Sequence, residues 1–344
     1  MPAPVFPHAA VASPHYLASS AGLVVLAQGG NAVDAAVATN LVLAVVYPHM
    51  CGVGGDLFAM VWNEGDLEGL NSSGRLPAGA ALTPGPAPGG ALKGSATLGA
   101  VPRHGVAAAT VPGAVAGWKA LLERYGTMPL AELAKPAMRL AREGCPRAPG
   151  LDKLTKAFAS LLERDDGAKR IYLAEGPLVQ AELADTLEDL DAFYAGPVAQ
   201  RAPAPFTPQD FADHRAEWVE PQRTRFAGLE VGERPPNSRG HLALRAIERL
   251  EPLEGLTPVD PEWHLRQVRA VDAAVDHGDT IYLCTRDERG MAVSLNQSLF
   301  EAFGSGVVVP GTGVLLHNRG AYFKSQEYAP KARPTAAPTA APPA

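Results

Sequence analysis

Hydrophobic positions near the start of the chain predict two helices followed by two strands. Residues 16–28 are rich in Ala, Leu and Val and stop at a Gly-Gly pair, which commonly ends a helix. Residues 32–46 follow an Asn suited to an N-cap and are hydrophobic on nearly every face, so this helix is expected to be central. The runs at 57–62 and 67–70 flank a Glu-Gly-Asp turn and predict paired strands.

Helical spacing dominates the middle of the chain and changes abruptly near its end. Hydrophobic positions about 3.6 residues apart predict helices at 112–124, 130–142, 152–164, 178–193, 207–215, 237–249 and 261–275, with a short strand pair within 217–231. After residue 279 the period becomes that of strands, with a hairpin at 280–286 and 291–299 and two further strands within 306–317. This order favours a layered α+β fold over repeating βαβ units.

Composition narrows the range of partners. The 344 residues are 47% hydrophobic and 19% charged, and 30 Lys+Arg against 36 Asp+Glu give a net charge of −6. Because the positive charges are scattered, neither nucleic acid nor an anionic membrane is an expected partner. No hydrophobic run reaches the ~20 residues of a membrane-spanning helix, and the first residues do not read as a secretory signal, so a cytoplasmic location is the expectation.

Cysteine and histidine spacing gives no sign of a disulfide framework or a metal site. The three cysteines are Cys51, Cys145 and Cys284, which lie far apart and form no Cys-x-x-Cys pair. The nine histidines form no His-Glu-x-x-His motif. We therefore expect no metal and no cofactor.

The glycine-rich loop at 52–56 (GVGGD) has two interpretations. Exposed backbone N–H groups of glycine loops can bind phosphate, but a nucleotide-binding loop follows a strand and opens a helix, whereas this loop follows a helix and enters a strand. Close packing of backbone against backbone is the favoured interpretation. The chain also contains no Gly-x-Ser-x-Gly elbow, so a serine nucleophile of the α/β-hydrolase type is not expected.

The pair Asp279-Thr280 at the head of the late hairpin carries the main chemical hypothesis. Threonine is common in strands and would ordinarily attract no attention. A hydroxyl becomes a nucleophile when a base takes its proton, and a free α-amine, with a pKa of about 7.7–8.0, is a suitable base on the same residue. Peptide cleavage immediately before Thr280 would release that amine.

Seven motifs, in the same serial order, resemble the γ-glutamyltranspeptidase family: 29–36 (GGNAVDAA), 48–56 (PHMCGVGGD), 111–118 (VPGAVAGW), 125–127 (YGT), 278–280 (GDT), 303–306 (FGSG) and 318–320 (NRG). The resemblance runs from about residue 10 to 333. It implies an N-terminal-nucleophile hydrolase with a four-layer αββα sandwich. Such a protein is made as a proenzyme that cuts itself before a threonine and then transfers or hydrolyses the γ-glutamyl group of glutathione and related amides.

The resemblance implies one domain at 1–334, with a large-subunit-like part at 1–279 and a small-subunit-like part at 280–334. Residues 335–344 contain only Thr, Ala and Pro, and we expect them to form a disordered tail. The expected partners are an amide substrate, water or an amino acid as acceptor, and the two pieces of the cut chain. Assembly into a homo-oligomer is left open.

Carried over by position, Thr280 matches the family's nucleophile, with cleavage between Asp279 and Thr280. Ser298 matches a hydroxyl residue that supports the nucleophile, although an outward strand serine is the simpler interpretation. Arg75 matches an arginine that binds substrate, and a guanidinium fork suits a substrate carboxylate, although it is equally a candidate surface arginine.

Three departures from the family pattern leave the acyl group open. The residues that hold the substrate's α-amino group in the family read Phe300, Arg319 and Tyr322 in this chain. The carboxylate partner of an ammonium is therefore absent, which makes a glutaryl-type acyl group, with a carboxylate but no amine, a competing substrate.

The chain also looks shortened. The match stops near residues 331–334, before the family's serine pair and oxyanion-hole glycines, and family sequence is skipped between about 271 and 277. Loss of one oxyanion donor costs about 10²–10³ in rate. The alternative function is therefore a catalytically impaired homologue that acts as a binding protein.

Overall fold

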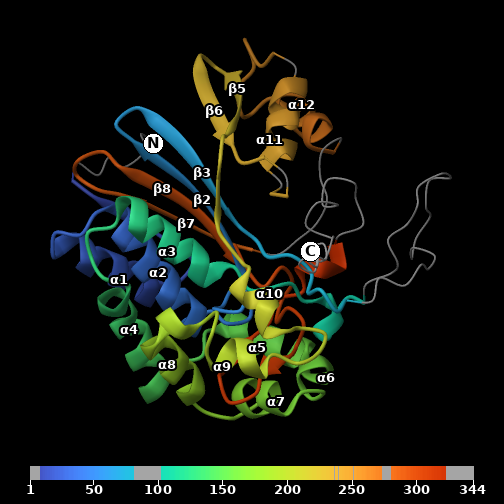
Figure 1. The fold of residues 1–344 in the computed structure, drawn as a ribbon. Coiled ribbons are helices and arrows are strands. Elements are labelled where there is room, and N and C mark those ends of the chain that lie inside the picture. The colour runs from blue at the N-terminus through green and yellow to red at the C-terminus, as the bar shows by residue number, and fades with distance from the viewer. Residues whose placement is uncertain are drawn as a thin grey trace, which may run out of the picture.

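The computed structural model describes residues 8–80, 102–235, 237–238, 240–250, 252–272 and 280–322. Its centre is a six-stranded antiparallel sheet of order β1-β7-β8-β2-β3-β4 (Figure 1). The strands of this sheet are β1 (Ala10–Ala12), β2 (Asp56–Asn63), β3 (Asp66–Ser72), β4 (Glu217–Val219), β7 (Ile281–Arg286) and β8 (Ala292–Ser298). Two small pairs complete the strands: β5 (Gln222–Phe226) with β6 (Leu229–Glu233), and β9 (Val308–Val309) with β10 (Val314–Leu315).

Helices are the second component of this α+β fold. The longer helices are α1 (Tyr16–Ala27), α2 (Ala32–Val46), α3 (Ala114–Tyr125), α4 (Leu130–Glu143), α5 (Pro149–Ala157), α8 (Ala181–Glu188), α11 (Gly240–Arg249) and α12 (Pro261–Asp272). Shorter helical segments are α6 (Ala159–Leu162), α7 (Asp166–Tyr172), α9 (Pro197–Arg201), α10 (Pro208–Ala212), and the 3₁₀ turns η1 (Val106–Ala108), η2 (Leu190–Ala192) and η3 (Arg319–Tyr322). None of the helices in the described ranges is long and hydrophobic enough to cross a membrane.

Helix α2 forms the centre of the hydrophobic core, as its sequence predicts. All of its residues are buried, and it packs between α1, α4 and the inner face of β7 and β8. On β7, Ile281 and Leu283 face this core, whereas Tyr282 points to the opposite face and is 52% exposed. Helices α1, α2 and α3 therefore cover one face of the sheet, and α4 packs on α2 beyond them (Figure 1).

The start of α2 is held by an extensive cap. The side chain of Asn31 accepts hydrogen bonds from the backbone of Val33 and Asp34, and Asp34 accepts one in return from the backbone N–H of Asn31. Asp34 is fully buried and also accepts from the backbone and hydroxyl of Thr127 and from the backbone of Met128. A single carboxylate thus joins α2 to the start of α4.

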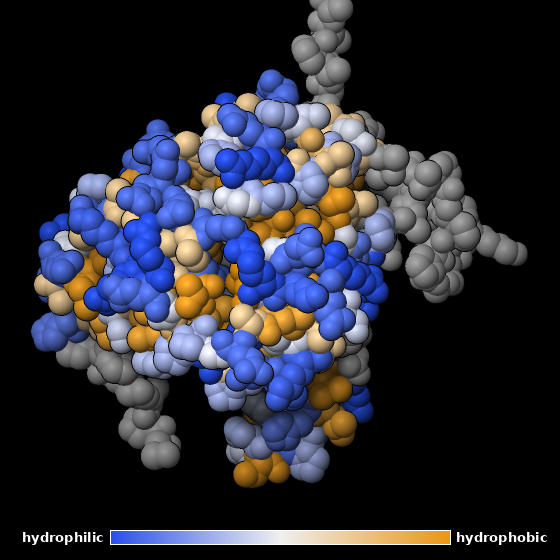
Figure 2. All heavy atoms as spheres, turned by 90° about the horizontal axis from the view of Figure 1, so that it is seen from below, coloured by the Kyte–Doolittle hydropathy of each residue, from blue (hydrophilic) through white to orange (hydrophobic). Residues whose placement is uncertain are grey.

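Hairpin β5–β6 and the helices α11 and α12 form a group beyond the other side of the sheet (Figure 1). The lower side in that view carries α4, α7 and α8, and there hydrophilic residues cover most of the surface with smaller hydrophobic areas between them (Figure 2). This distribution fits α4, whose Leu133, Ala137 and Ala141 turn inward. The outer face of these helices is a solvated surface.

Most of the expected elements are confirmed, with corrections where distant contacts intervene. The helix expected at 152–164 is broken at Phe158 into α5 and α6, and the one expected at 178–193 begins only at Ala181, because Leu178 pairs with Cys145 in a β-bridge. The strand pair within 217–231 is really β5 with β6, whereas β4 joins the main sheet. All three cysteines are free, as expected.

Candidate functional site

A cavity of about 280 Å³ lies at the end of the central strands, where five separate parts of the chain meet. Its lining comes from β2, the segment from β6 into α11, the start of β7, the end of β8 with the loop after it, and η3: Phe58, Glu233, Arg234, Asn237, Ser238, Gly240, Ala243, Thr280, Asn296, Ser298, Phe300 and Arg319. Thr280, Ser298 and Arg319, three of the residues selected from the sequence, therefore share one site.

Thr280 directly precedes β7 and is exposed in this cavity. Its hydroxyl lies 3.4 Å from the carbonyl oxygen of Gln297 and 3.3 Å from that of Ile281. The antiparallel register of β7 and β8, which pairs Ile281 with Gln297, fixes this position. The hydroxyl is therefore held between strands and presented to the cavity.

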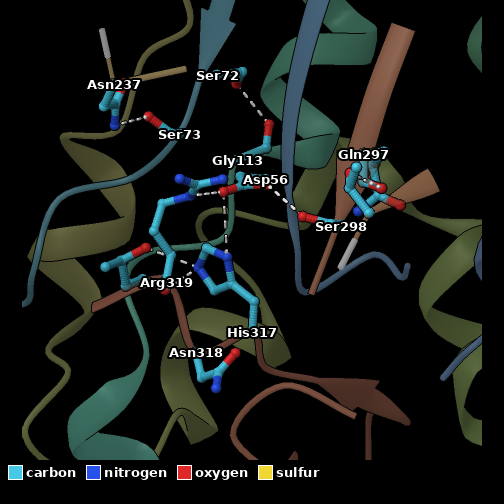
Figure 3. Close-up of polar contacts among 12 residues, drawn as sticks. Asp56, Ser72, Ser73, Gly113, Asn237, Gln297, Ser298, His317, Asn318 and Arg319 are labelled. Carbon is cyan, nitrogen blue, oxygen red and sulfur yellow. Dashed lines mark hydrogen bonds and ion pairs between the residues drawn. The ribbon is translucent and has the colours of Figure 1, made fainter. Parts of the chain in front are cut away.

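Asp56 is the buried anchor of the site (Figure 3). Its carboxylate forms an ion pair with Arg319 and lies 3.5 Å from the hydroxyl of Ser298, its register partner across β2 and β8. Because Asp56 is fully buried, the guanidinium of Arg319 supplies the positive charge that makes an ionised carboxylate tolerable there. This pair holds η3 against the end of the sheet.

His317 lies on the other side of the same carboxylate and is neutral. Burial lowers the pKa of His317 to about 4, although the negative charge of Asp56 acts in the opposite direction. Its Nε2 lies 3.0 Å from the carbonyl oxygen of Thr110, which can only accept, so this nitrogen carries the proton. At neutral pH the 3.8 Å approach of Nδ1 to Asp56 is therefore not an ion pair.

Two aromatic rings flank the guanidinium of Arg319. Its central carbon lies 5.1 Å from the centroid of Phe58 and 4.9 Å from that of Phe300, within the range of cation–π attraction. Phe300 has a φ of 78°, an unusual value for a residue with a side chain. Two of the three positions that depart from the family pattern thus contact each other.

Arg234 is the second guanidinium in the cavity. It is 7% exposed, donates to Asn296 Oδ1 at 2.9 Å, and lies 5.1 Å from the centroid of Phe58. Burial lowers the pKa of Arg234 to about 10, so it remains charged at neutral pH. No carboxylate of the described residues lies within ion-pair distance of it, whereas Arg319 is paired with Asp56.

The glycine loop packs closely against backbone, which confirms the favoured interpretation. A Cβ on Gly54 would lie 2.1 Å from the carbonyl oxygen of Leu315, and one on Gly55 would lie 2.3 Å from that of Ser298. The side chain of Gln297 also bonds both the N–H and the C=O of Gly52. The loop therefore packs directly against the end of β8 and the segment at Leu315, and it leaves no room for side chains at Gly54 and Gly55.

The other sequence candidates lie elsewhere. Arg75 lines a second pocket of about 240 Å³, where its guanidinium lies 3.9 Å from Glu217 and is 42% exposed. Asp279 and the side chain of Tyr322 lie outside the described residues. Among the residues that are described, no group of three or more His, Cys, Asp or Glu side chains could hold a metal ion.

Sequence reasoning did not assign a role to Asp56, His317 or Arg234. Asp56 and His317 lie in or beside recognisable motifs, but they are more than two hundred positions apart in the sequence and come together only in the fold. Arg234 stands just before a proline pair in a segment without a motif. A charged residue there looks like an ordinary loop residue until the fold buries it.

Comparisons with known proteins give a consistent result. A sequence model of the family described as "Gamma-glutamyltranspeptidase" matches residues 18–265 and 253–343. The chain is similar to the "Glutathione hydrolase-like YwrD proenzyme" of Bacillus subtilis, with 33% identity over 92% of this chain and 71% of the relative. It is 29% identical to the "Oxamate amidohydrolase proenzyme" of Klebsiella pneumoniae, again over 92% of this chain and 71% of the relative.

A solved structure agrees with these matches. The cephalosporin acylase from Bacillus halodurans aligns with a TM-score of 0.81 and 31% identity over 96% of this chain and 74% of that one.

Proposed function

Because this chain belongs to the γ-glutamyltranspeptidase family, we propose that it is a self-cleaving amide hydrolase or acyltransferase that acts through Thr280. The observation that carries the proposal is the exposure of Thr280 at the head of β7, in a cavity that it shares with Ser298 and Arg319. The family also supports the finer expectation of a four-layer αββα sandwich.

Activation would begin with self-cleavage. The hydroxyl oxygen of Thr280 attacks the carbonyl carbon of Asp279, the peptide C–N bond breaks, and an ester joins the two residues. Water then hydrolyses the ester, which leaves a carboxylate on Asp279 and a free hydroxyl and α-amine on Thr280. Since β7 and β8 are hydrogen-bonded between β1 and β2, the two pieces would remain together as a large and a small subunit.

Turnover would use the amine that cleavage releases. The α-amine of Thr280 accepts the proton of the hydroxyl while the oxygen attacks the substrate's amide carbon, and that proton passes to the departing amine. Water or an amino acid then attacks the acyl-threonine ester and returns a proton to the threonine oxygen. Ser298 would support the nucleophile from the adjacent strand, at the position that its contact with Asp56 fixes.

The acyl donor would be a γ-glutamyl amide or a related amide. The relatives are named for glutathione hydrolysis, oxamate amidohydrolysis and acylase activity, and glutathione and oxamate are both amides. Two carboxylates bear on the choice between these acyl groups. Asp56, beside the cavity, is already paired with Arg319, so a substrate ammonium would have to compete for it, whereas Glu233 lines the cavity and is the carboxylate that a γ-glutamyl amine could contact.

Intact-mass measurement of the purified protein tests the proposal directly. We expect two pieces that begin at residues 1 and 280, and a single full-length chain in Thr280→Ala. The conservative control Thr280→Ser keeps a hydroxyl and should still be cut.

Activity is measured by release of p-nitroaniline from γ-glutamyl- and glutaryl-p-nitroanilide. A wild-type chain that stays uncut on incubation and releases no product from either compound would contradict the proposal and support the catalytically impaired homologue instead.

A further inference from the structure

The charges in the Thr280 cavity are unbalanced in a way that points to an anionic ligand. Of its two guanidinium groups, that of Arg319 is neutralised by Asp56. That of Arg234 has one hydrogen bond, to Asn296, and its Nε and Nη1 are buried without a hydrogen-bond partner among the described residues. A buried cation in this state is costly unless an anion pairs with it.

The neighbouring carboxylate does not fill this role. Glu233 also lines the cavity, but its side chain lies against Gly240, where an added Cβ would meet Glu233 Oε2 at 2.4 Å. No ion pair joins it to Arg234 among the described contacts. The charges of Glu233 and Asp56 act on Arg234 only from beyond ion-pair distance, so no carboxylate of the described residues contacts its guanidinium directly.

The position of Arg234 relative to the nucleophile fits a substrate contact. Its partner Asn296 lies two residues before Ser298 on β8, and both side chains line the cavity. Between them, the carbonyl of Gln297 lies 3.4 Å from the hydroxyl of Thr280. Asn296, which holds Arg234, is therefore the strand neighbour of Gln297, whose carbonyl contacts the hydroxyl of Thr280.

We propose that Arg234 binds a carboxylate on the acyl part of the substrate, so that this protein takes monoamides of dicarboxylic acids. The inference rests on the proposed function and adds the group that selects the acyl chain. A guanidinium fork binds a carboxylate through two parallel hydrogen bonds, and Nη2, which has a second N–H beside the one given to Asn296, offers such a fork together with either Nε or Nη1. A substrate amine is not required, so glutaryl and γ-glutamyl amides are both included.

Matched anilides test this directly. Succinyl-, glutaryl- and adipyl-p-nitroanilide carry a terminal carboxylate at three distances, and pentanoyl-p-nitroanilide has the glutaryl chain length without it. The wild type should prefer one of the acids over pentanoyl. Arg234→Met should lose about 10- to 100-fold of that preference, mainly through KM, because charge-assisted hydrogen bonds to substrate are removed. Arg234→Lys, which keeps the charge without the fork, should recover part of it.

One control variant and one rival variant make the result specific. The control Arg225→Met removes an exposed arginine from the β5–β6 hairpin that precedes Arg234, and it should leave the preference unchanged. Arg75→Met tests the rival, which lines the second pocket and was assigned to substrate binding by the family resemblance. An unchanged preference in Arg234→Met, no preference for an acid in the wild type, or loss of the preference in Arg75→Met instead would each overturn the inference.

A binding measurement separates this inference from the proposed function. If no anilide is cleaved, the proposed function fails, but glutarate can still be titrated against the purified protein in a thermal unfolding assay. A rise in Tm with glutarate that pentanoate does not produce, and that Arg234→Met abolishes, supports the carboxylate site. Equal responses of wild type and Arg234→Met would overturn it.

Discussion

Replacing Asp56 with asparagine should strongly destabilise the fold, because it removes a charge on which another buried charge depends. Asp56 is fully buried, and the side chain of its partner Arg319 is 8% exposed. The asparagine keeps the size of the side chain, so little of the effect can come from a cavity. The guanidinium of Arg319 would remain between Phe58 and Phe300 without its carboxylate.

The expected cost follows from this burial. Removing one partner of a buried ion pair typically costs about 3–5 kcal/mol, whereas replacing both partners with neutral groups is often nearly neutral. Asp56→Asn should therefore lower the free energy of unfolding by about 3 kcal/mol or more. The double variant Asp56→Asn/Arg319→Met should be less destabilised than the sum of its single changes by about 2 kcal/mol.

Urea denaturation at pH 7, followed by tryptophan fluorescence, measures the free energy of unfolding of the parent protein, the two single variants and the double variant, which together form a double-mutant cycle. A Thr280→Ala background keeps every sample as one covalent chain. Arg170→Met is a matched control, since it breaks an exposed ion pair with Glu182 and should cost about 1 kcal/mol or less. Single changes that add within about 0.5 kcal/mol, or an Asp56→Asn cost below about 1 kcal/mol, would refute the reasoning.

Three further predictions concern the core and the site. Gly54→Ala should lower the free energy of unfolding in urea by about 1–3 kcal/mol, since its Cβ would meet the carbonyl of Leu315 at 2.1 Å. The control Gly52→Ala has its nearest contact at 3.6 Å and should cost less than about 1 kcal/mol, so equal costs would contradict the packing argument. Asp34→Ala should cost about 3 kcal/mol in the same assay, because several buried N–H groups lose their acceptor, and a change below about 1 kcal/mol would show that they find other partners. His317 should account for about 3 kcal/mol of the stability lost as pH falls from about 6.5 to 4, since the unfolded chain binds a proton there that the fold excludes. Burial lowers the pKa of His49 to about 4 as well, so His317→Gln should reduce the slope without abolishing it, and an unchanged slope would exclude His317 as a source.

The sequence was informative wherever structure depends on local pattern. The continuous hydrophobic run of α2 and the alternation of β7 and β8 predict their elements and their place in the core. Breaks such as Phe158, between α5 and α6, depend on packing from elsewhere and leave no trace in the periodicity.

The site was predicted only where a motif marked it. The motif that contains Thr280 identified the nucleophile candidate, and Ser298 was matched by position through the family resemblance. Arg234 could not be found in this way, because its importance comes from burial against Phe58 and from the pairing of Arg319 with Asp56. Local sequence cannot show which of two arginines will form an ion pair with a buried carboxylate and which will not.

The order of the sheet has a consequence for how the protein is made. Strands β7 and β8 fill the gap between β1 and β2, and the register joins Ala10 to Arg286. During synthesis, β1 and β2 therefore emerge long before the strands that pair with them, and each leaves an edge of unpaired backbone groups that can associate with other chains. Pairing at such sequence separation is slow. Folding of this sheet can be completed only after residue 298 has been made, and a nascent chain stalled before that point is an aggregation hazard.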